Sequence, residues 1–197
     1  SIASLRPYSW AKYWSRAGHD VTILTVPKKS MDSDSPQPIN DFHVIEVPIP
    51  GIDYLRAIFG RDGILNISSP QHNQYPKKIP SIKNMNWLYK TLIRYRNKYG
   101  FFSACRMPDQ LDLWGGIAFR AVLNRQWDLV VSTAWPYGVH RPAYRLKKDG
   151  RTAYWIMDWR DLWVDNHMFP GLPGFRFLER AMEAKWSGAA DAITTVS

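Results

Sequence analysis

The stretch WDLVVSTAWPYGVHRPAYRLKKDGRTAYWIM, residues 127–157, indicates the fold class. It begins with a short apolar run, WDLVVST, that is typical of a buried strand. A segment of helical pattern with a basic end follows, with Pro142 near its start and Gly150 as its stop. A second apolar run, TAYWIM, completes the unit. Strands joined through a helix pair in parallel, so this stretch predicts part of a parallel sheet.

The same alternation of strands and helices extends on both sides of this unit. Upstream, a helix stopped by Gly18 leads into a strand over residues 21–26, and a second strand is expected within residues 42–50. Helices are expected over residues 83–99, from Asp112 onward, and again from about Pro173, before a last strand, DAITTVS. This order predicts an α/β fold, a Rossmann-like and mostly parallel sheet with helices on both faces.

The length of 197 residues fits one domain with a substantial core. We therefore expect a single domain over residues 1–197, with a basic loop-helix excursion at about residues 51–110. A doubly wound sheet normally has a strand that feeds its first helix. We accordingly expect a first strand upstream of Ser1 and a continuation of the protein beyond Ser197.

Charge is unevenly distributed along the chain. The formal net charge is +9, and residues 63–108 hold eight Lys or Arg and no Asp or Glu. Such a basic region attracts phosphates, nucleic acid or an anionic membrane surface, although a solvated basic face without a partner has the same composition. The single cysteine, Cys105, is typical of a reducing, cytoplasmic location, and no apolar run is long enough to span a membrane.

Polar residues follow the apolar strand TAYWIM directly, in the sequence DWRDLW of residues 158–163. In open α/β sheets, ligands bind beyond the carboxyl ends of the strands, so Asp158 and Asp161 are candidates for the floor of a site, with Arg160 as a counter-charge. A structural ion pair or a helix cap would explain the same residues. His140 is similarly either a surface residue at a helix start or a donor to a hydroxyl or phosphate.

Five blocks of sequence together resemble the N-terminal domain of family-4-like glycosyltransferases with the GT-B fold. The resemblance covers residues 1–26 and roughly residues 100–197, and residues 27–99 match only in general character. The blocks are RPYSWAKYWSRAGHDVTILT, FFSACRMPDQLDLWGGIAFRAV, WDLVVSTAWPYGVHRPAYRLKK, YWIMDWRDLW and AMEAKWSGAADAITTVS. The resemblance implies the acceptor-binding half of an enzyme that moves a sugar from a nucleotide-sugar donor to a glycan or lipid-linked acceptor.

The resemblance also implies roles for individual residues. Asp161 is expected to orient the acceptor hydroxyl or to take its proton, with Asp158 and Arg160 as supporting partners. His140 and Tyr137 are expected to line the acceptor or donor-phosphate side. The acceptor-binding set as a whole is Asp158, Arg160, His140, Tyr137 and Arg6. No cofactor and no metal is expected, and the donor-binding domain with its Glu-x7-Glu motif is not within these residues, so this chain alone is expected to be inactive.

The basic helix suggests a peripheral position on the inner face of the plasma membrane. The residues expected at that interface are Lys83, Trp87, Lys90, Arg94 and Lys98. For the apolar stripe of the same helix, which includes Leu92 and Tyr95, we expect packing on the domain. Two alternatives stay open, a non-enzymatic phosphate- or nucleic-acid-binding α/β module and a GT-B-like nucleotide-sugar epimerase. The basic stretch has no nucleic-acid recognition motif, so we expect no nucleic-acid partner.

Overall fold

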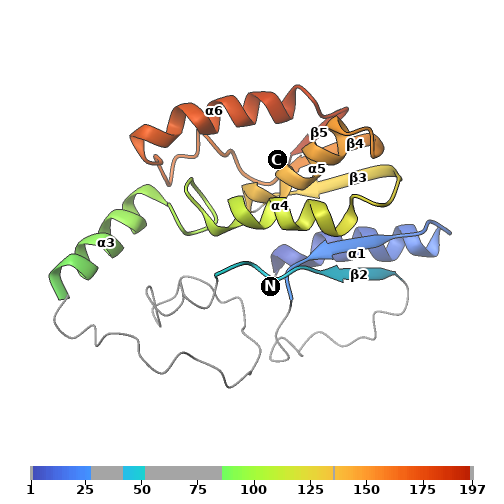
Figure 1. Cartoon of the computed structure of the whole chain (residues 1–197), viewed down its shortest axis with the longest axis horizontal. Coiled ribbons are helices and arrows are strands. Elements are labelled where there is room, and N and C mark those ends of the chain that lie inside the picture. The colour runs from blue at the N-terminus through green and yellow to red at the C-terminus, as the bar shows by residue number, and fades with distance from the viewer. Residues whose placement is uncertain (1, 28–41, 52–85, 135, 196–197) are drawn as a thin grey trace, which may run out of the picture.

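A computed structural model describes residues 2–27, 42–51, 86–134 and 136–195 of the chain (Figure 1). Helices and strands alternate along these residues in an α/β arrangement. The helices are α1 (Ile2–Arg16), α3 (Asn86–Tyr99), α4 (Gln110–Val122), α5 (His140–Lys148) and α6 (Pro173–Ser187), with a short 3-10 turn η3 (Tyr137–Val139) before α5. The strands are β1 (Thr22–Thr25), β2 (His43–Glu46), β3 (Trp127–Thr133), β4 (Thr152–Trp159) and β5 (Ala192–Thr195).

All strand pairs of the described residues are parallel, as the sequence predicts. They form two sheets rather than one: β1 pairs with β2, and β3, β4 and β5 form a three-stranded sheet in that order. The unit from β3 through α5 to β4 is the predicted strand-helix-strand unit. The expectation of one continuous sheet is therefore met only in part, because a sequence pattern identifies strands without showing which strands become neighbours.

The three-stranded sheet has helices on both faces. Side chains alternate along β4, so Trp155 and Met157 point to one face and Asp158 points to the other. Trp155 and Met157 are fully buried in a cluster that includes Ala143 of α5 and Trp186 of α6. Helix α1 reaches the opposite face, where Arg6 forms an ion pair with Asp158.

Helix α4 connects the two sheets. Its residues Leu111 and Trp114 pack against Leu24 of β1 and Ile45 of β2, and Phe119 packs near Val130 of β3. The start of the helix is closed by a capping box: the Asp109 side chain accepts from the helix backbone while the Asp112 side chain accepts from the backbone of Asp109.

Glycines end two of the helices where the sequence predicts a stop. Gly18 after α1 and Gly150 after α5 have φ angles of 91° and 65°, a left-handed conformation that favours glycine. Within α4, Gly115 allows a close approach of α5, because a Cβ atom there would lie 3.1 Å from Cβ of Arg141.

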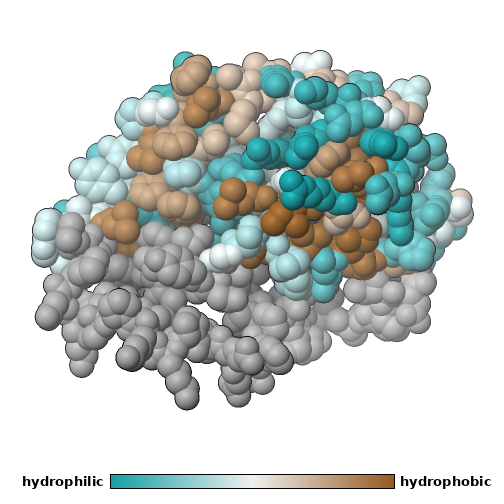
Figure 2. Space-filling model, viewed as in Figure 1, coloured by the Kyte–Doolittle hydropathy of each residue, from teal (hydrophilic) through white to brown (hydrophobic). Residues whose placement is uncertain are grey.

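The outer side of α4 carries the exposed residues Leu113 and Ile117, and Figure 2 shows hydrophobic residues in this part of the molecule bordered by strongly hydrophilic ones.

Candidate functional site

Asp158 lies at the carboxyl end of β4 between two threonines. The parallel register aligns it with Thr133 of β3 and Thr194 of β5. Both hydroxyls donate to its carboxylate at 2.7 Å, and Nη2 of Arg6 donates at 3.0 Å. A carboxylate with 0% exposure would be very unfavourable without such donors. Of the explanations that the sequence left open for Asp158, which were a ligand site, a structural ion pair and a helix cap, the contacts support the ion pair.

Arg6 is the charged partner that α1 contributes to this arrangement. Its guanidinium also lies 4.6 Å from the ring centroid of Trp10, so it is held on two sides. Asp158 and Arg6, both expected to contact an acceptor, contact each other. Asp158 has no exposed surface to offer an acceptor, so we assign it a structural role at the strand ends, whereas the Arg6 side chain is 30% exposed.

His140 is also fully buried in the protein. Its ring has 0% exposure and meets the Trp159 ring edge-to-face, with 4.3 Å between centroids. Nδ1 lies 2.8 Å from the Ser132 hydroxyl oxygen, which itself accepts a hydrogen bond from the indole N–H of Trp155. Burial lowers the pKa of His140 to about 3, so the ring is neutral. The expected donor to a hydroxyl or phosphate is thus a core residue that supports Trp159.

Tyr137 occupies the turn η3 and is almost fully buried. Its ring stacks on Trp163 with 4.3 Å between centroids, and Trp163 in turn stacks on Trp186 of α6. The phenol donates a hydrogen bond to Oδ1 of Asp112 at 2.9 Å. Burial raises the pKa of both Tyr137 and Asp112. Tyr137 therefore joins the capping box of α4 to the aromatic core.

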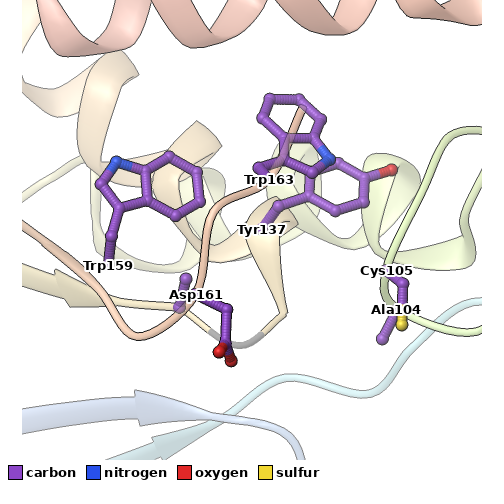
Figure 3. A pocket seen from close by; sticks show the side chains of 7 residues that line it. Ala104, Cys105, Tyr137, Trp159, Asp161 and Trp163 are labelled. Atoms are coloured by element: carbon purple, nitrogen blue, oxygen red, sulfur yellow. The ribbon is translucent and has the colours of Figure 1, made fainter. Parts of the chain in front are cut away.

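A small pocket lies beyond the carboxyl ends of β3 and β4 (Figure 3). Asp161 is the only charged residue of its lining, and it is exposed. Its carboxylate oxygens point away from the indole rings (Figure 3). Arg160, the expected counter-charge, is half-buried and does not line the pocket. The lining residues are Ala104, Cys105, Ala134, Tyr137, Trp159, Asp161 and Trp163.

The loop that brings Ala104 and Cys105 to the pocket has an unusual backbone. Phe102 and Ala104 have φ angles of 48° and 65°, a left-handed conformation that costs free energy for residues other than glycine. The N–H of Ala104 donates to Oδ2 of Asp109 at 2.8 Å, and the guanidinium of Arg96 donates to the carbonyl of Phe102. Such strain persists where surrounding contacts hold it, and it gathers at functional sites.

Two residues that the sequence analysis did not single out, Arg106 and Glu179, fix the walls of the pocket. Arg106 donates to the carbonyls of Trp163 and Val164 at 2.6 and 2.7 Å, and lies 3.3 Å from the Glu179 carboxylate. Glu179 also accepts from the N–H of Met107 at 2.8 Å. Burial lowers the pKa of Arg106 and raises that of Glu179. The pair joins the loop before α4 to the loop after β4, and both loops line the pocket.

The basic helix α3 carries the remaining expected residues. Trp87, Lys90, Arg94 and Lys98 are exposed, and Lys83 lies outside the described residues. The apolar stripe does not pack on the domain as expected: Tyr95 is 52% exposed and Leu92 is exposed too. The physical reason is visible in Figure 1, where α3 extends away from the other described elements.

Within the described ranges, no cluster of three or more His, Cys, Asp or Glu side chains is placed to hold a metal ion. The same residues contain no helix that is long and apolar enough to cross a membrane. Comparisons with protein families, with curated proteins and with solved structures found no match to this chain.

Proposed function

We propose that this chain binds the acceptor in a glycosyl-transfer reaction. The Asp161 carboxylate accepts a hydrogen bond from the acceptor hydroxyl. One observation carries the proposal: Asp161 is an exposed carboxylate on a pocket beyond the carboxyl ends of parallel strands β3 and β4. That is the place where open α/β sheets bind their ligands. The resemblance to family-4-like glycosyltransferases supports the same reaction class.

The chemistry requires an acceptor oxygen that is oriented and made more nucleophilic. The acceptor hydroxyl donates its hydrogen bond to the Asp161 carboxylate, and its oxygen forms the new bond to the anomeric carbon of the donor. The bond from that carbon to the diphosphate oxygen breaks, and the nucleoside diphosphate leaves with the electron pair. The proton of the acceptor passes to the carboxylate. In this scheme the nucleotide-sugar donor is bound by a second domain.

The contacts that join the pocket walls support this role for Asp161. A productive hydroxyl geometry must be held closely, and a pre-formed site avoids the free-energy cost of ordering during the reaction. Arg106 and Glu179 join the two loops that line the pocket, and Asp109 holds the strained Ala104. His140 and Tyr137 fix the aromatic rings behind Asp161 and are positioning residues in this proposal.

Cys105 provides a direct test, because it is the single cysteine of the chain and lines the same pocket as Asp161. The rate of Cys105 alkylation by iodoacetamide is measured with methyl glycosides of glucose, mannose and N-acetylglucosamine. At least one glycoside is expected to slow the reaction. The variant Asp161→Asn is expected to weaken this protection about tenfold or more, because a hydrogen bond to a charged group contributes about 1.5–3 kcal/mol.

The matched control is Asp165→Asn, an exposed acid of the same loop that does not line the pocket. This variant is expected to keep full protection. Equal protection in both variants would remove Asp161 from the site. Protection by inorganic phosphate, with none by any glycoside, would favour the phosphate-binding alternative. Protection by a nucleotide sugar alone would favour the epimerase.

A further inference from the structure

In helix α3, among the residues whose side chains are described, the buried residue lies near the C-terminal end. Arg96 is 3% exposed and donates to the carbonyl of Phe102 at 3.1 Å and to the side chain of Asn97. Tyr99 is half-buried, and Gly100 is buried. The rest of the helix extends away from the other described elements (Figure 1). The helix is thus fixed at its C-terminal end, and most of its described side chains are exposed to solvent.

The exposed side of α3 combines positive charge with aromatic side chains. Lys90, Arg94 and Lys98 follow one another at intervals of four residues, which places them on one side of a helix. Trp87 is three residues before Lys90 and 69% exposed, and Tyr95 is 52% exposed. The helix has no Asp or Glu along its whole length, so no acidic neighbour within α3 neutralises the three cations.

We propose that this surface of α3, formed by Trp87, Lys90, Arg94, Tyr95 and Lys98, binds an anionic lipid membrane and lies in its interface. Charge complementarity selects an anionic partner, because the surface holds three cations and no acid. The exposed Trp87 and Tyr95 select a lipid surface, since their amphipathic rings are most stable between headgroups and acyl chains. Amphipathic helices with Lys and Arg on one face and aromatic or aliphatic side chains on another bind membranes in this way.

The fixed C-terminal end gives the helix a defined relation to the body of the protein. Tyr99 is followed directly by the loop that supplies Ala104 and Cys105 to the pocket. That loop is held by Arg96 at one end and by Asp109 at the other. A membrane bound to α3 is therefore held at a fixed position relative to the pocket rim. The membrane proposal itself does not depend on Asp161 or on sugar transfer.

Vesicle sedimentation of the full chain tests the proposal. The chain is expected to pellet with vesicles of equal parts phosphatidylcholine and phosphatidylglycerol, and not with phosphatidylcholine alone. The triple variant Lys90→Gln, Arg94→Gln, Lys98→Gln is expected to bind the anionic vesicles about 100-fold more weakly, at roughly fivefold for each cation removed. Added salt is expected to weaken binding of the unaltered chain, because it screens the attraction.

A control triple variant removes the same charge elsewhere: Arg120→Gln, Arg125→Gln, Lys148→Gln, all at exposed positions on the body. It is expected to bind like the unaltered chain. The proposal is overturned by equal binding of both triple variants, or by equal binding to neutral and anionic vesicles. The proposal would also be overturned if the chain bound a random-sequence DNA duplex more tightly than anionic vesicles, and if the α3 triple variant no longer bound the DNA. The variant Trp87→Ser separates the two partners further, since it should weaken binding to vesicles while leaving any binding to DNA unchanged.

Discussion

Asp158 and Asp161 stand three residues apart in the sequence DWRDLW, yet their surroundings are opposite. Asp158 is the next-to-last residue of β4 and has no exposed surface. Asp161 lies two residues beyond the end of β4, is exposed, and lines the pocket. The sheet makes the difference. Within the strand, parallel register places a threonine on each side of Asp158, whereas beyond the strand no such neighbours exist.

An acidic residue at a strand end can therefore serve two separate purposes. Where the strand is still paired, a carboxylate can join three strands and a helix. Asp158 does so through Thr133, Thr194 and Arg6. One step further along the chain, the same residue type is available to a ligand. The first use contributes stability and the second contributes function, so substitutions should separate the two.

The largest expected effect is on stability, from Asp158→Ala. The change leaves two threonine hydroxyls without their acceptor and Arg6 without its counter-charge. We expect a loss of about 3 kcal/mol in the free energy of unfolding, at the low end for a broken ion pair, because Arg6 is partly hydrated. Urea denaturation followed by circular dichroism measures it. A loss below about 1 kcal/mol would show that the buried network contributes little.

His140 is also fully buried, and its titration should make the stability of the protein depend on pH. Its pKa is lowered to about 3 in the folded protein from an ordinary value of 6.5, because burial disfavours the charged ring. The folded state therefore binds fewer protons than the unfolded state between these values. The stability that His140 contributes is complete above pH 6.5 and is lost as the pH falls toward 3.

The expected loss from His140 is about 2 kcal/mol between pH 6.5 and roughly pH 5. Buried carboxyl groups such as Glu179, whose pKa is raised by burial, act in the opposite sense. Urea denaturation of the unaltered chain and of His140→Gln over this pH range isolates the histidine, because the carboxyl contributions are common to both. Parallel curves for the two proteins would mean that His140 is not buried as a neutral ring.

Much of the fold could be predicted because it depends on local patterns. Apolar β-branched runs identified the strands, and Gly18, Gly150 and Pro173 marked helix ends where the structure has them. The parallel pairing of β3 with β4 followed from the helix between them. The division into two sheets could not be predicted, since strand neighbours are set by contacts that a single sequence does not display.

The candidate pocket lies at the strand ends that the sequence pointed to, but the contacts around it could not be predicted. The carboxyl ends of β3 and β4 do lie at a pocket, and Asp161 does line it. The burial of Asp158 depends on Arg6, which is 152 positions away, and no local pattern indicates that contact. Arg106 was counted within a basic stretch, and only the folded chain brings it to Glu179, 73 positions later.

The proposed role of Asp161 requires that its side chain does not stabilise the fold, so replacing it should change the free energy of unfolding least. The measurement is the free energy of unfolding of Asp161→Asn in urea at neutral pH, beside Asp158→Ala. We expect Asp161→Asn to unfold within about 0.5 kcal/mol of the unaltered chain, as is usual for an exposed substitution. A loss comparable to that of Asp158→Ala would contradict the proposed role, because it would make Asp161 a second structural carboxylate.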